Sequence, residues 1–168
     1  MTRTLAAATA ALAILAAPAV AQSTVGEVVD DTIERIRMEL DDLESEASPD
    51  GVAETMDRLV AAVEEAGATV FARVDHAQGA RDVDMVLPES QLLIFGNPQL
   101  GTPVMQEDIL AGLYLPLRVL VHATPEGSVL VWEEPEELFD DLEVDDDLEA
   151  IGKMEDALEM LAKKAAGS

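Results

Sequence analysis

The residue types best suited to binding a ligand cluster at a predicted strand-to-helix junction, between residues 95 and 106. Gly96 ends an apolar run, and Thr102 followed by Pro103 is a typical helix start, with Thr102 expected as the N-cap. Free backbone N–H groups at a helix start can hold an anion, and Gly101 would let a ligand come close. Turn and cap chemistry also accounts for these residues without a ligand, and that simpler interpretation stays open.

We predict one pocket for a small molecule or an anion around this junction. Its expected members offer an amide, a hydroxyl, a carboxylate, an imidazole and a guanidinium: Asp75, His76, Asn97, Gly101, Thr102 and Arg73. The arginine would capture an anion beside Asn97, or it would pair with neighbouring acidic side chains.

The two histidines of the chain, His76 and His122, are each expected near the end of a strand. With Met105 they are the candidate ligands for a copper site, and a histidine with a carboxylate could hold another metal. No chelating spacing connects these residues. We therefore expect ordinary strand-end histidines, with no metal and no other cofactor.

Catalytic motifs of common enzyme classes are absent from the sequence. The chain has no G-x-S-x-G elbow, no H-E-x-x-H pair and no phosphate-binding loop. It has no cysteine, which excludes thiolate nucleophiles and zinc–thiolate sites. We assign no catalytic residue and favour a binding or accessory protein over an enzyme. The enzymatic alternative is an acid–base couple of His76 and Asp75.

The charge of the chain is strongly acidic. Asp and Glu number 35 against 10 Lys and Arg, which gives a formal net charge of −25. Such a surface repels phosphate backbones and anionic lipid heads, so nucleic acid is not an expected partner. The acidic residues 145–149 lack the glycine and glutamate of a calcium loop and are interpreted as a solvated run.

The first 21 residues have the three parts of an export signal. Arg3 gives a positive start, residues 5–17 form an apolar run, and Ala19-Val20-Ala21 offers the small residues that a signal peptidase needs. Cleavage after Ala21 would leave a periplasmic or secreted protein. The apolar run is too short to span a membrane comfortably, so no stable membrane span is expected after cleavage.

The rest of the chain divides into three predicted parts. Residues 22–40 form a helical extension whose apolar stripe would pack on the domain or mediate a homo-oligomer. Residues 41–139 form an α+β domain, and residues 140–168 form an acidic segment and a C-terminal helix.

Inside the α+β domain, the apolar pattern predicts about five strands with helices between them. Ser48 as N-cap and Pro49 as the first helical residue would begin a helix that stops near Gly67. The expected strands are 41–47 at an edge, 69–75, 91–95, 115–122 and 129–132, the last two as a hairpin. Further helices are expected at 136–142 and 147–165. This order implies a two-layer α+β sandwich, with an antiparallel sheet covered by helices on one face and with N- and C-terminal helices added.

Five short segments in series resemble the domain-of-unknown-function 302 family. They are SPDGVAETMDRL at 48–59, VFARVDHA at 70–77, LLIFGNP at 92–98, GTPVMQ at 101–106 and LPLRVLV at 115–121. The similarity in order and spacing extends over roughly residues 39–139. It implies a compact α+β sandwich and leaves the function open, because the family has no established activity. The chain departs from the family pattern at residues 122–124 and 133–137.

Overall fold

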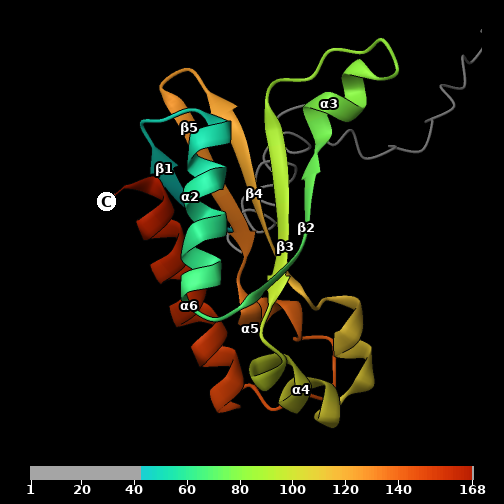
Figure 1. Cartoon of the computed structure of the whole chain (residues 1–168). Helices are drawn as coiled ribbons and strands as arrows, with labels where there is room; N and C mark the ends of the chain where they lie inside the picture. Colours follow the sequence, from blue (N-terminus) through green and yellow to red (C-terminus); the bar gives the residue numbers. More distant parts are fainter. Residues whose placement is uncertain (1–42, 168) are drawn as a thin grey trace, which may run out of the picture. The chain divides into compact units, whose positions relative to one another are not determined.

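A five-stranded sheet organises residues 43–167, the part of the chain that the computed structural model describes. Its strands are β1 (Leu43–Ser48), β2 (Thr69–Asp75), β3 (Ser90–Gly96), β4 (Leu117–Thr124) and β5 (Gly127–Glu133). All neighbours pair antiparallel, in the order β1-β5-β4-β3-β2, so β4 is central and β1 and β2 are the edges (Figure 1). The predicted signal peptide (1–21) and helical extension (22–40) lie outside the described residues.

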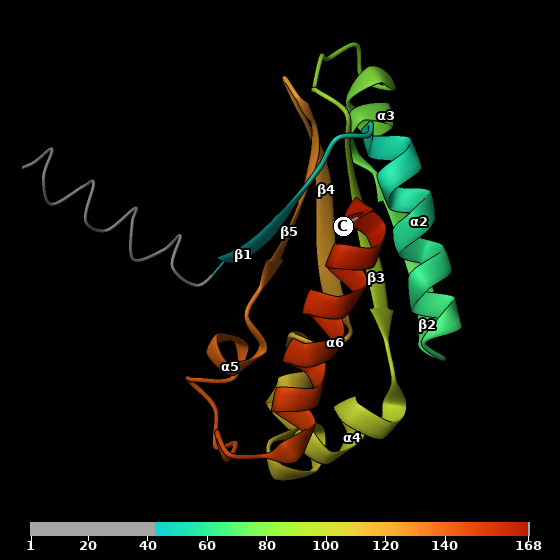
Figure 2. The same ribbon diagram turned by 90° about the vertical axis from the view of Figure 1, so that its left-hand side faces the viewer.

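Helices accompany this sheet, the two longest as a second layer on one face and the shorter ones near its ends (Figures 1 and 2). They are α2 (Val52–Glu65), α3 (His76–Arg81), α4 (Pro98–Glu107), the 3-10 helix η1 (Ile109–Leu113), α5 (Pro135–Leu138) and α6 (Glu149–Ala166). α2 and α6 lie side by side against the sheet, and α4 lies beyond the end of β3 (Figures 1 and 2). The predicted α+β sandwich is confirmed. Within residues 43–167, no helix has both the length and the apolar character that crossing a bilayer requires.

The core lies between the sheet and the two long helices. On β4, Leu117, Val119 and Val121 are buried while Arg118 is exposed, as the alternation of side chains along a strand requires. Apolar stripes of the two long helices pack against these side chains. The stripes include Met56, Leu59 and Val63 of α2 and Ile151, Met154, Leu158 and Leu161 of α6. Each fully buried Leu, Val or Met contributes about 1.5–3 kcal/mol to folding, so this interface is a major source of stability.

The C-terminal helix belongs to this core. α6 packs along α2 and also contacts β1, β5 and α4. Phe139, just before the acidic segment, is only 2% exposed and meets Tyr114 edge-on, with 6.3 Å between the ring centroids. The boundary that we predicted between residues 139 and 140 therefore does not mark the end of the core.

The start of α2 differs from its prediction. Gly51 is the N-cap, whereas Ser48 remains in β1 and pairs with Ser128 of β5. Because the β1–β5 ladder continues to Ser48, the chain becomes helical only after the turn that follows. The Ser48 hydroxyl accepts a hydrogen bond from the Asp50 N–H at 3.3 Å and so stabilises that turn instead of the helix.

Candidate ligand-binding cavity

A cavity of about 270 Å³ opens at the end of the sheet where β3 stops and β4 starts. Its walls come from β2, β3, α4, β4, α6 and the segments that lead into β2 and β4. The buried part of the lining is Phe95, Gly101, Leu117, Met154, Leu158 and Leu161, and the exposed rim is Ala66, Phe71, Pro98 and Thr102. The interior is thus built almost entirely from apolar side chains.

Asn97 and Pro98 start α4 at the edge of the cavity. Asn97 is the N-cap, because its Oδ1 accepts a hydrogen bond from the Gln99 N–H at 2.9 Å, and Pro98 is the first helical residue. The predicted start at Thr102 is therefore wrong, since Thr102 and Pro103 lie inside α4. The same combination of an N-cap residue followed by proline occurs earlier in the chain, at Asn97 and Pro98, and the helix begins at that position.

Two glycines allow close packing around the cavity. A β-carbon on Gly96 would lie 3.3 Å from the Cβ of Pro116, and one on Gly101 would lie 3.4 Å from the Cδ1 of Leu115. Both separations are at the short end of ordinary contacts between carbon atoms. Glycine at these positions lets β3 and α4 pack against the segment that leads into β4.

Polar side chains of the lining are limited to Asn97 and Thr102, and none of the lining residues is ionisable. Among residues 43–167, no group is hydrogen-bonded to the Asn97 amide nitrogen or to the Thr102 hydroxyl. Met105 and Met154 also line the cavity, and their flexible thioethers adapt to different shapes. Apolar walls with a few polar groups are the usual chemistry of a small-molecule site.

The single pocket that we predicted is not formed, because its members lie at both ends of β2. Thr69 pairs with Gly96 at the cavity end of the strand, whereas Asp75 pairs with Gln91 at the other end. The seven residues of β2 separate the two ends by about 20 Å. The predicted residues that line the cavity are Asn97, Gly101 and Thr102, and those toward the far end of β2 are Arg73, Asp75 and His76.

Arg73 and Asp75 have structural partners in the protein. Arg73 joins α2 to β3, with its Nη1 2.5 Å from Asp57 Oδ1 and its Nε 2.6 Å from Gln91 Oε1. Asp75 is the N-cap of α3, because its Oδ1 accepts a hydrogen bond from the Gln78 N–H at 2.7 Å. Both side chains therefore hold elements in place at this end of the sheet.

The metal candidates do not converge. His122 of β4 pairs with Ser90 of β3, and its Nδ1 lies 3.1 Å from the Ala123 carbonyl oxygen. His76 is the exposed first residue of α3, next to β2, so β3 lies between the two histidines. Met105 is far from both, in the cavity lining. The described residues contain no group of three His, Asp or Glu side chains that could hold a metal ion.

One known family matches almost all of the residues that the structure describes. The profile described as "Domain of unknown function DUF302" matches residues 44–166. The chain belongs to the DUF302 family. The match continues past residue 139 and includes α6, in agreement with the packing of that helix in the core.

A solved DUF302 structure has the same fold. It is the uncharacterized conserved protein DUF302 from Bacillus stearothermophilus, which aligns with a TM-score of 0.68 and 20% identity. The alignment covers 74% of this chain and 98% of that chain. At this level of identity, the similarity establishes the fold of the DUF302 domain and says nothing of a ligand.

Curated relatives include two proteins named "Fluoride-specific ion channel FluC 1", from Brucella suis biovar 1 and Brucella abortus biovar 1. Each is 48% identical to this chain over 81 residues, which are 48% of the chain. These residues make up 31% and 29% of the two relatives. The chain thus spans less than a third of the length of the relatives it matches.

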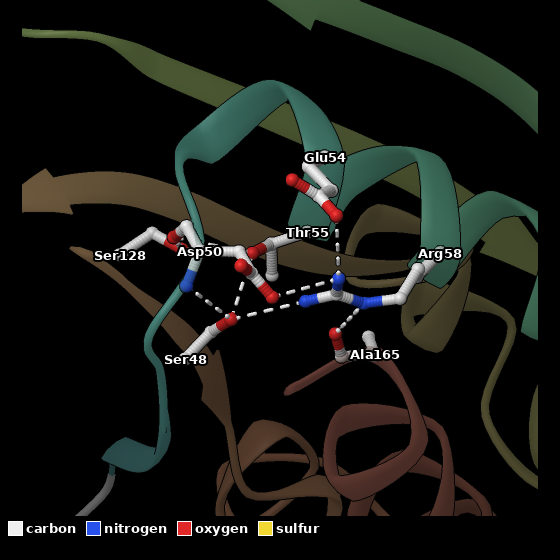
Figure 3. Close-up of polar contacts among 7 residues, drawn as sticks. All are labelled: Ser48, Asp50, Glu54, Thr55, Arg58, Ser128 and Ala165. Carbon is white, nitrogen blue, oxygen red and sulfur yellow. Dashed lines mark hydrogen bonds and ion pairs between the residues drawn. The ribbon is translucent and has the colours of Figure 1, made fainter. Parts of the chain in front are cut away.

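A second group of polar side chains in the DUF302 domain stabilises the fold through hydrogen bonds to one another (Figure 3). Thr55 Oγ1 is buried, 2.9 Å from Ser48 Oγ and 3.0 Å from Ser128 Oγ. Ser128 Oγ also lies 2.8 Å from the Asp50 carbonyl oxygen. Among the described residues, no buried side-chain nitrogen or oxygen lacks a hydrogen-bond partner, so this network is satisfied without a ligand.

Ion pairs shift the pKa of several groups on the surface of the domain. A hydrogen bond from the Lys164 ammonium, 2.5 Å from Glu65 Oε2, lowers the pKa of the Glu65 carboxyl. Lys153 lowers the pKa of Glu149 in the same way, and a hydrogen bond to Glu159 raises the pKa of Lys163. None of these groups lines the cavity.

Proposed function

We propose that this DUF302 domain binds a small apolar molecule in the cavity beside α4. The observation that carries the proposal is the cavity of about 270 Å³ with apolar walls and, at its edge, two hydrogen-bond donors without a partner in the described residues, the Asn97 NH₂ and the Thr102 hydroxyl. A cavity lined by apolar atoms stays poorly hydrated, so an apolar ligand gains contacts there without displacing strongly bound water.

The lining supports binding more than catalysis. Proton transfer requires a titratable group within hydrogen-bond reach of the substrate, and no lining residue is ionisable. The alternative couple of His76 and Asp75 lies toward the far end of β2, where the Asp75 carboxylate caps α3. A binding or accessory role is therefore the function that this geometry supports best.

Filling the cavity tests the proposal. Ala157 of α6 lines the cavity, so Ala157→Phe places a ring inside it, and Ala61→Phe on the exposed face of α2 is the matched control. We expect octan-1-ol to shift the amide NMR signals of α4 and α6 in the full chain and in Ala61→Phe. Ala157→Phe should lose at least about 90% of this binding while keeping its fold. Unchanged binding in Ala157→Phe would refute the site.

We also propose that the protein acts outside the cytoplasm. The support is the charged start, apolar run and Ala19-Val20-Ala21 sequence of the first 21 residues. Expression in a Gram-negative cell followed by fractionation should give a periplasmic chain whose N-terminal residue is Gln22. An uncleaved chain that stays in the cytosol would contradict export.

A second candidate function is that of an accessory domain in ion transport across a membrane. It is favoured by the 48% identity over 81 residues with proteins named as fluoride-specific ion channels. Deleting the gene should then slow growth in millimolar sodium fluoride, and the intact gene should restore it. Equal growth of the deletion strain and its parent across fluoride concentrations would rule out this role.

A further inference from the structure

We infer that the ligand of the cavity carries an uncharged hydrogen-bond acceptor, such as an ester, amide or alcohol oxygen, at the end held by Asn97 and Thr102. This inference deepens the proposed function and depends on it. The same apolar chain with a carboxylate end should bind much more weakly.

The first argument is the absence of charge from the lining. Charged residues make up 27% of the chain, so a set of 18 residues would hold about five if it followed the composition. The lining holds none. A carboxylate or an ammonium group that entered the cavity would lose its hydration and find no side chain of opposite charge.

The second argument is the negative electrostatic potential of the protein around the cavity. The chain has a formal net charge of −25, which disfavours the approach of an anion. Glu65 is next to the rim residue Ala66, and the Glu65 carboxylate already engages the ammonium group of Lys164 in an ion pair. The rim thus offers an incoming carboxylate no available cation among these residues.

The third argument is the fixed orientation of the Asn97 amide. Its Oδ1 is held by the Gln99 N–H at 2.9 Å, which leaves the NH₂ group as the free part of the side chain. That group only donates hydrogen bonds, and the Thr102 hydroxyl on the same helix can donate another. Two neutral donors match a neutral oxygen acceptor, because neither supplies a charge that would favour a carboxylate at this edge of the cavity.

The volume sets the size of the probe. Drug-sized ligands occupy pockets of about 300–1,000 Å³, and a cavity of about 150 Å³ holds one benzene ring. A cavity of about 270 Å³ therefore suits a molecule between these sizes, with roughly ten non-hydrogen atoms. Eight-carbon chains are suitable probes, and their end groups can be changed one at a time.

The test compares methyl octanoate, octan-1-ol, sodium octanoate and octyltrimethylammonium below their micelle concentrations, against the full chain at neutral pH. Titrations followed by amide NMR shifts give the four dissociation constants. We expect the ester and the alcohol to bind, and the two ions to bind at least about tenfold more weakly. Octanoate binding as tightly as methyl octanoate would overturn the inference.

Two variants test the proposed role of the donors. Asn97→Asp keeps a good N-cap for α4 but replaces the donating NH₂ by a carboxylate oxygen, so it should weaken methyl octanoate binding at least about fivefold. Thr102→Val should weaken it about threefold or more, whereas Thr124→Val at the far end of β4 should leave it unchanged. Unchanged affinity in both cavity variants would also overturn the inference.

The cavity-filling variant Ala157→Phe distinguishes a failure of the proposed ligand-binding function from a failure of the inference about the uncharged end group. If Ala157→Phe abolishes the binding of every probe but octanoate binds as well as the ester, the cavity binds ligands and only the uncharged end group is wrong. If no probe binds the full chain, or if Ala157→Phe binds them all unchanged, the proposed function itself fails.

Discussion

Arg58 of α2 donates a hydrogen bond from its Nε to the carbonyl oxygen of Ala165 in α6, with 2.6 Å between the two atoms (Figure 3). Ala165 lies in the last turn of α6, where backbone carbonyls lack helical partners and carry the negative end of the helix dipole. The same guanidinium lies 2.9 Å from Asp50 Oδ2 and donates to Ser48 Oγ at 3.2 Å. One side chain therefore links both core helices to the end of β1.

Replacing this arginine should destabilise the fold. Arg58→Met keeps the aliphatic stem but removes the hydrogen bonds, and we expect the free energy of unfolding to fall by about 2 kcal/mol. Arg58→Lys should restore only part of the loss, because an ammonium lacks the planar fork that reaches Ala165, Ser48, Asp50 and Glu54 at once. Urea unfolding followed by the fluorescence of Trp132, the single tryptophan of the chain, measures both values.

Arg81→Met is the matched control for Arg58. Arg81 is exposed on α3, where its guanidinium bonds to Gln78 of the same helix and lies 4.0 Å from Asp75. Exposed contacts of this kind contribute little, so the variant should change the free energy of unfolding by less than about 0.5 kcal/mol. Equal losses in Arg81→Met and Arg58→Met would show that Arg58 has no special part in holding α6.

Gly127 should tolerate no side chain. Its φ of +148° favours glycine, and a β-carbon there would lie 2.3 Å from the Ser48 carbonyl oxygen and 2.7 Å from the Pro49 carbonyl carbon. Both neighbours are backbone atoms, one at the last residue of β1 and one in the turn that follows, so relief requires moving that edge of the sheet. We expect Gly127→Ala to lower the free energy of unfolding by about 3 kcal/mol.

Gly79→Ala is the control for Gly127. No atom lies within 4 Å of a β-carbon on Gly79, and the residue is inside α3. Alanine is the better helix former, so this variant should raise the free energy of unfolding by about 0.5 kcal/mol. A mild loss in Gly127→Ala, similar in size to ordinary surface changes, would mean that the turn after β1 shifts freely.

The strands were predictable from the sequence because their signals are local. The predicted strand 69–75 coincides with β2, and β4 and β5 form the predicted hairpin. α3 was missed although the sequence contains its signal. Asp75 followed three residues later by Gln78 is a capping pattern, and we interpreted Asp75 as a ligand instead.

The cavity was only partly predictable. Asn97, Gly101 and Thr102 were expected at a ligand site because turn and cap residues are visible in the sequence. The apolar walls were not, since Leu158 and Leu161 have the same spacing as the rest of the α6 stripe. Some residues of that stripe pack against other side chains, and others face the cavity. The position of α4 decides between the two, and no local sequence pattern predicts where α4 lies.

The ion pair between Lys164 and Glu65 should make stability depend on pH in the acid range. The pKa of Glu65 is lowered in the folded protein from its ordinary value of 4.5, so the folded state favours the carboxylate. The stabilising contribution is present above about pH 4.5 and is lost as the pH falls through the lowered folded pKa. Lys164→Met should raise the pKa of Glu65, as measured by the NMR titration of its side-chain carboxyl carbon.

Lys153→Met is the control for this titration. Lys153 pairs with Glu149 at the other end of α6, so its replacement should raise the pKa of Glu149 and leave that of Glu65 unchanged. The difference in stability between the original chain and Lys164→Met should shrink as the pH falls below 4.5. A Glu65 titration that is the same with and without Lys164 would contradict the pairing.

Screening by salt should stabilise this protein. With a formal net charge of −25, repulsion among the carboxylates opposes the compact state, and the range of this repulsion falls from about 30 Å in 0.01 M salt to about 3 Å at 1 M. We expect the Tm to rise by about 5 °C or more when sodium chloride increases from about 10 mM to about 0.5 M. A triple variant, Asp140→Asn, Asp141→Asn and Asp146→Asn, removes three exposed charges from the acidic segment and should show a smaller rise. If the Tm instead falls with salt, the surface ion pairs stabilise the domain more than its net charge destabilises it.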